Sequence, residues 1–313
     1  MAQMAEQRKL EGFPDEDAFL RELDSFLHQF TMQRQVSGDV HRLKIPGHES
    51  IAFWPPKKRK MLSRVAPSSD LYEAVTTALM SFILHRFDIH NVYDIGSYSG
   101  YFAMVAASKA GSSSTVHAFE MDPRRSAAIT RTLEGEPYAQ GRVHNHLAGL
   151  SDHEEGERTV WHTRNDFYET KPTEQEYQES MWRRLKFRMR GMHDRNQLHE
   201  ARVLVTSIDA FAEKHGAPDL IKLDVDGYEA KVIPGAMKTF REKRPFLLFE
   251  LHKSERLARL GATRQGLMQM LFDCGYRAAT FSDHHDCSKA RVERVTPDSP
   301  AVHREKTDLF LLY

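Results

Sequence analysis

One segment, Asn91–Gly100, restricts the fold of this chain more than any other. It begins with the short apolar run Asn-Val-Tyr-Asp-Ile, passes through a turn punctuated by glycines, and leads into an apolar helical stretch from Tyr101. This pattern predicts a strand, a tight turn and a helix N-terminus, where the backbone can approach a ligand closely. Many α/β proteins contain such a segment. Its meaning depends on the next predicted strand, which ends in an acid, Glu120.

Strand and helix patterns alternate from this segment to the C-terminus. The predicted strands are Asn91–Ile95, Thr115–Glu120, Arg142–Leu147, Val203–Ile208, Asp219–Val225, Phe246–Leu251, Tyr276–Phe281 and Asp308–Tyr313. This alternation predicts an α/β fold with a mostly parallel sheet and helices on both faces. The last two strands suit a hairpin added to one edge of that sheet.

The remaining residues form an N-terminal extension and one long insert. In residues 1–69 we expect a helix, from apolar residues at helical spacing over Pro14–Phe30, and a short β-hairpin made by His41–Ile45 and Ser50–Trp54. Residues 70–313 would form the domain that contains this strand–helix alternation, and its first helix should bury one apolar stripe. The insert at about 153–202 is rich in charged and aromatic residues and could form a substrate lid, since connections of this length are functional or disordered.

Composition excludes several classes of protein. The 313 residues contain 44 basic and 44 acidic side chains, so no overall charge marks a nucleic-acid or membrane-surface binder. Two cysteines are too few for a disulfide framework. The N-terminus is polar and no apolar run could span a bilayer, so we expect a cytoplasmic protein. Lys57–Lys60 and Arg183–Arg195 are locally basic and could bind anions or lie in solvent.

Polar residues stand at the ends of the predicted parallel strands. Ligands of such sheets bind outside the carboxyl ends of the strands, where the strand order reverses. This rule places along one rim Asp94, Glu120, Asn145, His146, Asp224, Asp226, Glu250 and His252.

Two ligand classes fit an acid-glycine turn followed by an acid on the second strand. Dinucleotides require Gly-x-Gly-x-x-Gly, whereas here Tyr98 stands between Gly96 and Gly100, and Asp94 precedes the turn. A carboxylate suits a cationic ligand better than a pyrophosphate. S-adenosylmethionine carries an ammonium, a sulfonium and ribose hydroxyls, and Glu120 could accept both hydroxyls. The pattern therefore favours methyl transfer.

The ordered motifs resemble those of FkbM-family methyltransferases over roughly residues 70–313. The motifs are Asp-Ile-Gly-Ser-Tyr-Ser-Gly (94–100), Ala-Phe-Glu-Met-Asp-Pro (118–123), Gly-Leu-Ser-Asp (149–152), Thr-Ser-Ile-Asp (206–209), Ile-Lys-Leu-Asp-Val-Asp-Gly-Tyr-Glu (221–229), Pro-Gly-Ala (234–236) and Pro-Phe-Leu-Leu-Phe-Glu (245–250). The resemblance implies a Rossmann-like class I methyltransferase fold with a seven-stranded sheet and an antiparallel C-terminal strand. It also implies S-adenosylmethionine as cofactor, S-adenosylhomocysteine as product, and transfer usually to a hydroxyl oxygen. The chain departs from the family at Tyr98, usually Asn, and at Asp226, usually Glu.

The resemblance also implies roles for individual residues. Asp94 or Gly96 would contact the methionine portion of the cofactor, Glu120 the ribose, and Met121 the adenine, with His146 and Ser151 on the adenine side. The full set of expected cofactor-binding residues is Asp94, Gly96, Ser97, Tyr98, Gly100, Glu120, Met121, His146, Ser151 and Asp224.

Transfer to an alcohol needs a base that removes the hydroxyl proton. The candidates are His252, Asp224, Asp226 and Glu250, of which His252 has the most suitable reference pKa. A structural role for this histidine is equally compatible with the pattern. Asp224 and Glu250 could share a proton, orient Lys222 or hold a divalent metal, and Asp-x-Asp-x-Tyr resembles the metal-binding segment of macrocin-type sugar O-methyltransferases. A divalent metal is compatible with these residues but is the less favoured interpretation.

Other histidines and the acceptor are less constrained. We interpret His284, His285 and Cys287 as a polar loop rather than a zinc site. The leading hypothesis is a methyltransferase for a hydroxyl on a small molecule, sugar or natural product. The alternatives are a methyltransferase acting on RNA or protein, and a non-catalytic cofactor-binding protein whose Tyr98 occludes the pocket. The oligomeric state is open, and a homodimer would be compatible with the sequence.

Overall fold

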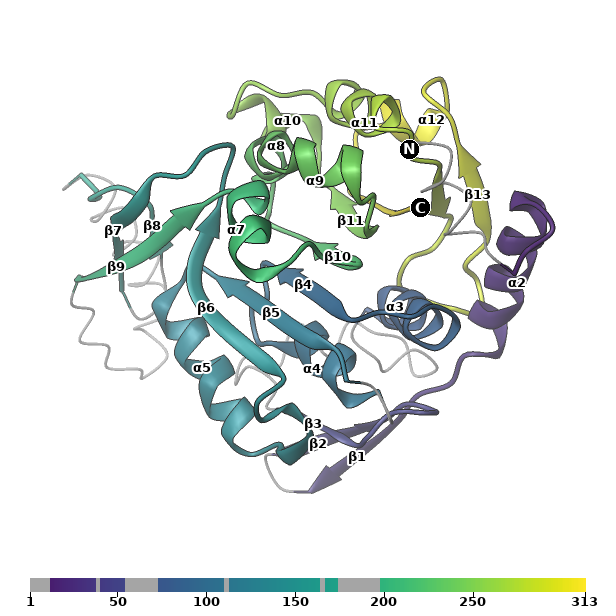
Figure 1. Cartoon of the computed structure of the whole chain (residues 1–313), viewed down its shortest axis with the longest axis horizontal. Coiled ribbons are helices and arrows are strands. Elements are labelled where there is room, and N and C mark those ends of the chain that lie inside the picture. The colour runs from purple at the N-terminus through teal and green to yellow at the C-terminus, as the bar shows by residue number, and fades with distance from the viewer. Residues whose placement is uncertain (1–11, 38–39, 54–72, 110–112, 164–166, 174–197) are drawn as a thin grey trace, which may run out of the picture.

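The computed structural model describes residues 12–37, 40–53, 73–109, 113–163, 167–173 and 198–313. Its centre is a single large sheet with helices on both faces (Figure 1). The order of strands in this sheet is β13-β12-β14-β11-β10-β4-β5-β6-β9-β7-β8. Their bounds are β4 Asn91–Ile95, β5 Thr115–Glu120, β6 Val143–Leu150, β7 Gly156–His162, β8 Phe167–Tyr168, β9 His199–Thr206, β10 Leu220–Leu223, β11 Phe246–Leu251, β12 Ala278–Phe281, β13 Val292–Val295 and β14 Asp308–Leu312.

Parallel pairing runs through the middle of the sheet, and antiparallel pairing occurs towards both ends. Each neighbouring pair from β11 through β10, β4 and β5 to β6 is parallel, as is β6 with β9. The strand β14 is antiparallel to both β11 and β12. The predicted mostly parallel sheet with an antiparallel C-terminal strand is therefore confirmed. After β4 the chain turns to β5 on one side and later to β10 on the other, so the strand order reverses between β4 and β10.

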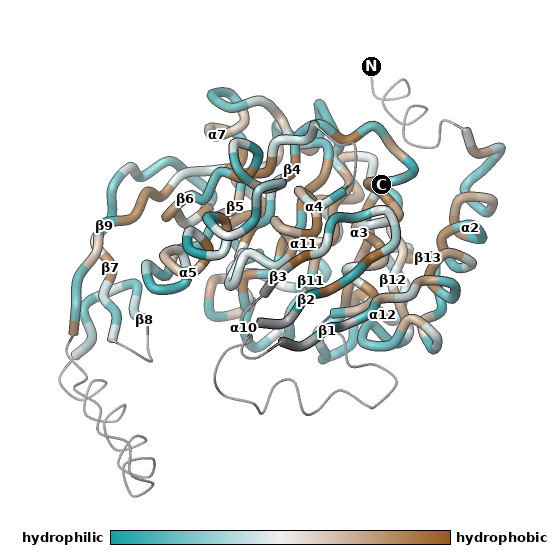
Figure 2. Tube along the Cα trace, turned by 90° about the horizontal axis from the view of Figure 1, so that it is seen from below, coloured by the Kyte–Doolittle hydropathy of each residue, from teal (hydrophilic) through white to brown (hydrophobic). Residues whose placement is uncertain are grey.

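Helices cover the two faces of the sheet, and the sheet separates the core into two main clusters. In Figure 1, α3, α4 and α5 lie on one side of the sheet and α7 to α11 on the other. The helix bounds are α2 Glu16–Gln29, α3 Ala74–Arg86, α4 Tyr101–Ser108, α5 Pro123–Glu134, α7 Ile208–His215, α8 Glu229–Val232, α9 Met237–Glu242, α10 Ser254–Ala258, α11 Arg264–Asp273 and α12 Pro300–His303, with 3₁₀ turns η2 Pro137–Ala139 and η3 Pro234–Ala236. Figure 2 shows hydrophobic positions gathered on the central strands and hydrophilic ones on the outer parts.

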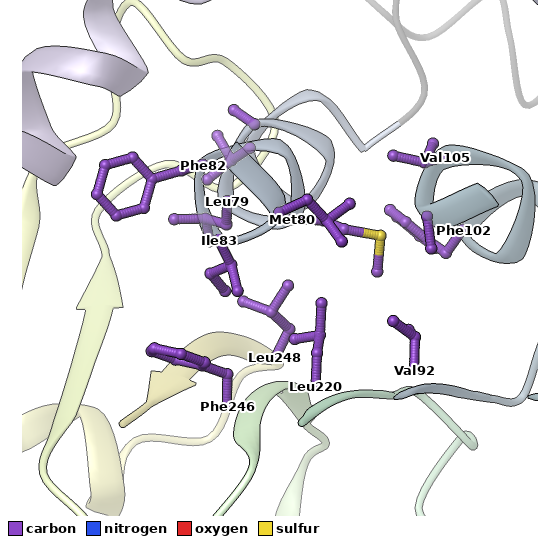
Figure 3. Packing of buried hydrophobic residues seen from close by; sticks show 14 of the residues in the cluster. Leu79, Met80, Phe82, Ile83, Val92, Phe102, Val105, Leu220, Phe246 and Leu248 are labelled. Atoms are coloured by element: carbon purple, nitrogen blue, oxygen red, sulfur yellow. The ribbon is translucent and has the colours of Figure 1, made fainter. Parts of the chain in front are cut away.

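Helix α3 is buried on nearly every side, which corrects the predicted single apolar stripe. All of its residues from Ala74 to Leu84 are buried. Figure 3 shows Leu79, Met80, Phe82 and Ile83 of α3 packing over the sheet and beside α4. The helix begins after Glu73, whose φ is +49°. A helix that is apolar all round belongs in the interior, because no face of it favours water.

The described part of the N-terminal extension packs against this core. Phe19, Leu23 and Leu27 of α2 are fully buried in the same cluster as α3. The predicted β-hairpin is present as β2 (Val40–Lys44) and β3 (Ile51–Phe53), but a third strand that the pattern did not show, β1 (Gln33–Ser37), joins it. The division of the chain at residue 69 stays a prediction.

The insert at 153–202 is more regular than its composition suggests. Strands β7 and β9 pair antiparallel and extend the sheet as an arm at one end of the molecule (Figures 1 and 2). Residues 174–197, including the basic segment, lie outside the described residues, as does Lys57–Lys60. The lid therefore stays a prediction. None of the described helices combines the length and apolar character needed to cross a bilayer.

Candidate active site

A cavity of about 1210 Å³ opens along the carboxyl ends of the parallel strands. This volume exceeds the roughly 300–1,000 Å³ usual for the pocket of one small ligand, so the cavity can hold two ligands together. The predicted site residues that line it are Gly96, Tyr98, Glu120, Met121, Asp224, Asp226, Glu250 and His252. Five others, Asp94, Ser97, Gly100, His146 and Ser151, do not line it.

The turn after β4 is fixed by its backbone. The N–H groups of Gly96 and Ser97 both donate to the carbonyl of Phe119, at 3.1 and 3.0 Å. Gly96 has a φ of +77°, and a Cβ there would lie 1.9 Å from the carbonyl oxygen of Asp224. Only glycine fits where two strand ends approach this closely.

Glu120 closes the same turn from the end of β5. Its Oε2 accepts from the N–H of Tyr98 at 2.9 Å, and its Oε1 accepts from the N–H of Asp122 at 2.8 Å. Burial raises the pKa of Glu120, although these hydrogen bonds and Arg125 act against it. Each carboxylate oxygen keeps a further lone pair for a ligand.

Tyr98 does not fill the cavity. Its φ is +51°, in the left-handed region, and its side chain is 37% exposed. The guanidinium of Arg125 lies 4.4 Å from the centre of its ring. The ring therefore packs against α5 at the cavity wall.

Asp94 supports the turn from behind. It is fully buried, and its Oδ2 accepts from the N–H of Ala103 at 3.0 Å. Its Oδ1 is buried with no hydrogen-bond partner among the described residues. Burial raises the pKa of Asp94, and the positive charge of Lys222 opposes that effect. Ser97 Oγ donates to the Asp94 carbonyl at 2.7 Å, and Gly100 starts α4 with a φ of +77°.

The two residues expected on the adenine side point elsewhere. His146 packs beneath α7, where its Nε2 lies 3.0 Å from Nδ1 of His117 and its ring stacks on Phe119. Ser151 is buried, and its Oγ donates to Asp152 at 3.2 Å. Gly149 and Met121 do line the cavity in this region, and they lie next to each other.

Acidic and basic groups gather at the ends of β10 and β11. Asp224 Oδ2 lies 3.5 Å from Nζ of buried Lys222. Burial, together with Asp224 and Glu73, raises the pKa of Glu250 to about 8. For Lys222, burial lowers the pKa, but the surrounding carboxylates, Asp224 first, outweigh it and raise the pKa. Glu250 can therefore hold or release a proton near neutral pH.

His252 follows β11 and is only 6% exposed. Its Nε2 lies 3.8 Å from Asp224 Oδ1 and 3.6 Å from Asp226 Oδ1, and its Nδ1 lies 2.8 Å from Glu229 Oε1. Burial acts to lower its pKa, but the hydrogen bond and charge of Glu229, with Asp224 and Glu250, outweigh burial and raise it.

Several cavity residues were not predicted from the sequence. Arg256, His284, His285 and Lys289 line the cavity, the last three from the loop between β12 and β13. The sequence pattern predicts these histidines only as part of a polar loop. The sequence predicts no role for Glu229, because its buried position opposite His252 is a tertiary feature. Its sequence signal is only an acid in the first turn of a short helix.

One group of side chains has the composition of a metal site. Asp224, Glu229 and His252 each offer a ligand atom, and these atoms lie within 4.8 Å of one another. Glu229 Oε1 and His252 Nδ1 are already hydrogen-bonded at 2.8 Å, so a cation between them would have to displace their shared proton. We treat the group as hydrogen-bonded and assign it no metal.

The strand order and the position of the cavity define the class of protein. Seven strands run in the order β6-β5-β4-β10-β11-β14-β12, with β14 antiparallel between β11 and β12. The cavity lies at the carboxyl edge around the switch point between β4 and β10. This is the Rossmann-like class I methyltransferase fold, extended here by β13 at one end and by β9, β7 and β8 at the other.

Sequence comparison identifies the family. The profile of the Methyltransferase FkbM domain matches residues 94–278, which is more than half of the chain. The chain therefore belongs to the FkbM methyltransferase family. No curated protein matches the sequence significantly.

Solved structures with similarity to the chain include other methyltransferases. Methyltransferase FkbM from Methylobacillus flagellatus is 18% identical with a TM-score of 0.43, and the match covers 82% of this chain and 51% of that one. An O-methyltransferase from Bacillus cereus in complex with SAH is 12% identical with a TM-score of 0.37, covering 100% and 98%. Aeropyrum pernix fibrillarin with bound S-adenosyl-L-methionine is 11% identical with a TM-score of 0.34, covering 90% and 98%. The family assignment depends on the sequence profile.

Proposed function

We propose that this protein transfers the methyl group of S-adenosylmethionine to a hydroxyl oxygen of a small-molecule or glycan acceptor. The observation that carries the proposal is the continuity of one cavity. Gly96 and Glu120 line it from the ends of β4 and β5, and His252 with its neighbouring carboxylates lines it from the ends of β10 and β11. A donor and an acceptor can therefore occupy it side by side, and such positioning supplies much of the rate of a two-substrate reaction.

The residues at the β4–β5 end fit the cofactor. Glu120 offers carboxylate lone pairs to ribose hydroxyls, and Met121 and Gly149 offer an apolar slot to a purine. When bound, the cofactor supplies a methyl group activated by its sulfonium. Gly96 has no side chain, so the methionine portion can approach the backbone of the turn. Ser97, Tyr98 and Gly100 would act by shaping this turn.

His252 is the residue that we assign as general base. Its Nε2 would take the proton of the acceptor hydroxyl, and its raised pKa keeps the resulting imidazolium stable. Asp224 and Asp226 stand on the Nε2 side and can hold the charge that develops on the ring. Glu250 would serve as a hydrogen-bond donor or acceptor to the acceptor molecule.

The charges of the described cavity wall support a neutral hydroxyl compound over a phosphate-bearing polymer. Arg256 is paired with Asp226, and Lys289 with Asp286 at 3.0 Å. Two of the cations on this wall are therefore already neutralised by carboxylates, which leaves less positive charge for a phosphate backbone. We further propose a cytoplasmic location, supported by the two buried cysteines, which are both free.

Calorimetry with S-adenosylhomocysteine tests the cofactor assignment. Glu120→Ala removes a charged hydrogen-bond acceptor and should weaken binding by about tenfold to a hundredfold. The control is Glu134→Ala, which makes the same change at an exposed position outside the cavity. Absence of binding to the wild-type protein, or equal affinity in the two variants, would remove the assignment.

Methyl transfer from radiolabelled cofactor tests the acceptor class. We expect label to appear in free sugars or other alcohols, and in neither RNA nor protein. Label in a polymer, with affinity that falls steeply with salt, would favour the polymer alternative. Cofactor binding without transfer to any acceptor would favour the non-catalytic alternative.

A further inference from the structure

The ring of His252 is held by a second buried residue, Glu229. Glu229 is the first residue of α8 and is fully buried, and its Oε1 lies 2.8 Å from Nδ1 of His252. The same oxygen accepts from the N–H of Val225 at 3.3 Å. A histidine nitrogen that faces a carboxylate at this distance is the one that carries the proton, since the carboxylate can only accept.

Keeping an acid at this position is costly for folding. Glu229 Oε2 is buried with no hydrogen-bond partner among the described residues. A carboxylate in the interior is unfavourable unless it is paired and hydrogen-bonded, and a neutral or apolar side chain would avoid the penalty. The contacts that compensate Glu229 are the short one to His252 and the longer one to the N–H of Val225. The pairing is therefore better explained by what it does to the histidine than by a gain in stability.

The backbone of His252 is fixed separately from its ring. Arg264, from α11, is 2% exposed and donates from Nη1 to the carbonyls of Leu251 at 2.7 Å and His252 at 2.9 Å. Its Nη2 donates to Asp308 at 2.8 Å. The end of β11 is thereby immobilised. The remaining freedom of His252 is the rotation and tautomer of its ring, and Glu229 contacts that ring directly.

The opposite nitrogen of the ring faces the cavity. Nε2 lies 3.6 Å from Asp226 and 3.8 Å from Asp224, which is beyond hydrogen-bond distance. Glu250, from β11, is the other acid near the ring, while Lys222 is paired with Asp224 and Arg256 with Asp226. An acceptor hydroxyl can therefore approach Nε2 within the cavity.

We propose that Glu229 is a positioning residue, which holds His252 as the Nδ1–H tautomer so that the Nε2 lone pair receives the proton of the acceptor hydroxyl. This inference rests on the proposed function, because it assumes that His252 is the base. The O–H bond of the acceptor breaks as the new N–H bond forms, and the proton later leaves to solvent. Glu229 stabilises the imidazolium between these events.

The wild-type protein alone provides the first test. Nitrogen-15 NMR of the histidine side chains, with His252 assigned by comparison with His252→Asn, reports which ring nitrogen carries the proton above the pKa. We expect the Nδ1–H tautomer, which is the minority form of free histidine. An Nε2–H tautomer in the folded wild-type protein would overturn the proposal without any change at Glu229.

Glu229→Gln provides the second test. Glutamine can still accept from Nδ1 but carries no charge, so we expect the pKa of His252 to fall by about one to three units. Turnover should fall by about a hundredfold or more, with the acidic limb of the pH–rate profile moved to lower pH. Affinity for S-adenosylhomocysteine should change less than about twofold. Glu229→Asp, which keeps the charge, should recover part of the lost turnover.

Glu136→Gln is the matched control for the loss of a buried acid. Glu136 is 3% exposed, pairs with Arg42 at 3.8 Å and does not line the cavity. We expect it to leave the His252 tautomer, its pKa and turnover unchanged. A wild-type pH–rate profile in Glu229→Gln would refute the positioning role. Failure of the wild-type protein to bind S-adenosylhomocysteine would instead refute the proposed function, whatever the tautomer.

Discussion

Replacing Gly96 with alanine should damage the site much more than the same change at a glycine of similar backbone conformation. Gly96 has a φ of +77°, and Gly141, outside the cavity, has a φ of +72°. Alanine at either position has to adopt the left-handed conformation, which costs about 1–2 kcal/mol. That cost is common to both variants, so the difference between them reports the surroundings.

The surroundings differ sharply. A Cβ at position 141 meets nothing within 4 Å, whereas a Cβ at position 96 lies 1.9 Å from the carbonyl oxygen of Asp224. Real contacts of this kind are not closer than about 3.0 Å, so the ends of β4 and β10 must separate. Overpacking of this kind costs about 1–3 kcal/mol. A shift of about 1 Å at a reacting group can reduce turnover by about a hundredfold.

Urea denaturation and calorimetry measure these two effects. We expect Gly96→Ala to lose about 1–3 kcal/mol more of its free energy of unfolding than Gly141→Ala does. We also expect weaker binding of S-adenosylhomocysteine in Gly96→Ala and wild-type binding in Gly141→Ala. Equal midpoints and equal affinities in the two variants would show that the close approach of β4 and β10 does not constrain the site.

Three further predictions concern buried ionisable side chains and metal removal. Burial, with neighbouring histidines, lowers the pKa of His117 to about 3 and of His146 to about 4. In the unfolded chain these histidines bind protons below about pH 6.5, whereas in the folded protein they do not. The free energy of unfolding therefore decreases as the pH falls from about 6.5 towards 4. When the pH is lowered from 7 to 5, the free energy of unfolding of His117→Phe should decrease by about 1–2 kcal/mol less than that of the wild-type protein. Urea denaturation at the two pH values measures this difference, and equal decreases in the two proteins would contradict it. Arg264→Met should lower the free energy of unfolding by about 3 kcal/mol or more, because it removes the buried ion pair with Asp308 and several hydrogen bonds to carbonyls. The control is Lys214→Met, which removes an exposed ion pair and should barely change the urea midpoint. Dialysis against a chelator should leave S-adenosylhomocysteine affinity and turnover unchanged, and loss that Mg²⁺ restores would instead indicate a bound cation.

Much of the fold follows from local pattern. Apolar runs of strand length alternate with helical stretches. The strand predicted at Phe246–Leu251 is β11 as observed, because its apolar residues 246–249 are consecutive and are buried on both faces of the sheet. The polar residues at strand ends were also predictable as a group, since parallel strands end at one edge. Strands β7, β8 and β13 of the large sheet were not, whereas β9 corresponds to the strand predicted at Val203–Ile208. Short β13 is the last strand at one end of the sheet, and charge-rich β7 is next to the last strand at the other end. Few of their residues are buried, so their sequences have only a weak apolar pattern.

The sequence by itself determined which residues stand at the rim, beginning with the turn at Asn91–Gly100 and the acid at Glu120. Only the tertiary structure decided which of them reach the cavity. Asp94 lies in β4 just before the turn, but its side chain is buried behind that turn. His146 packs against α7 instead of the cavity. The register of each strand and the direction of each side chain decide which residues reach the cavity. Glu229 and His252 lie 23 positions apart in the sequence, so only the folded chain shows that they are partners. Local periodicity records burial, whereas a site is made by elements that are distant in sequence and meet in space.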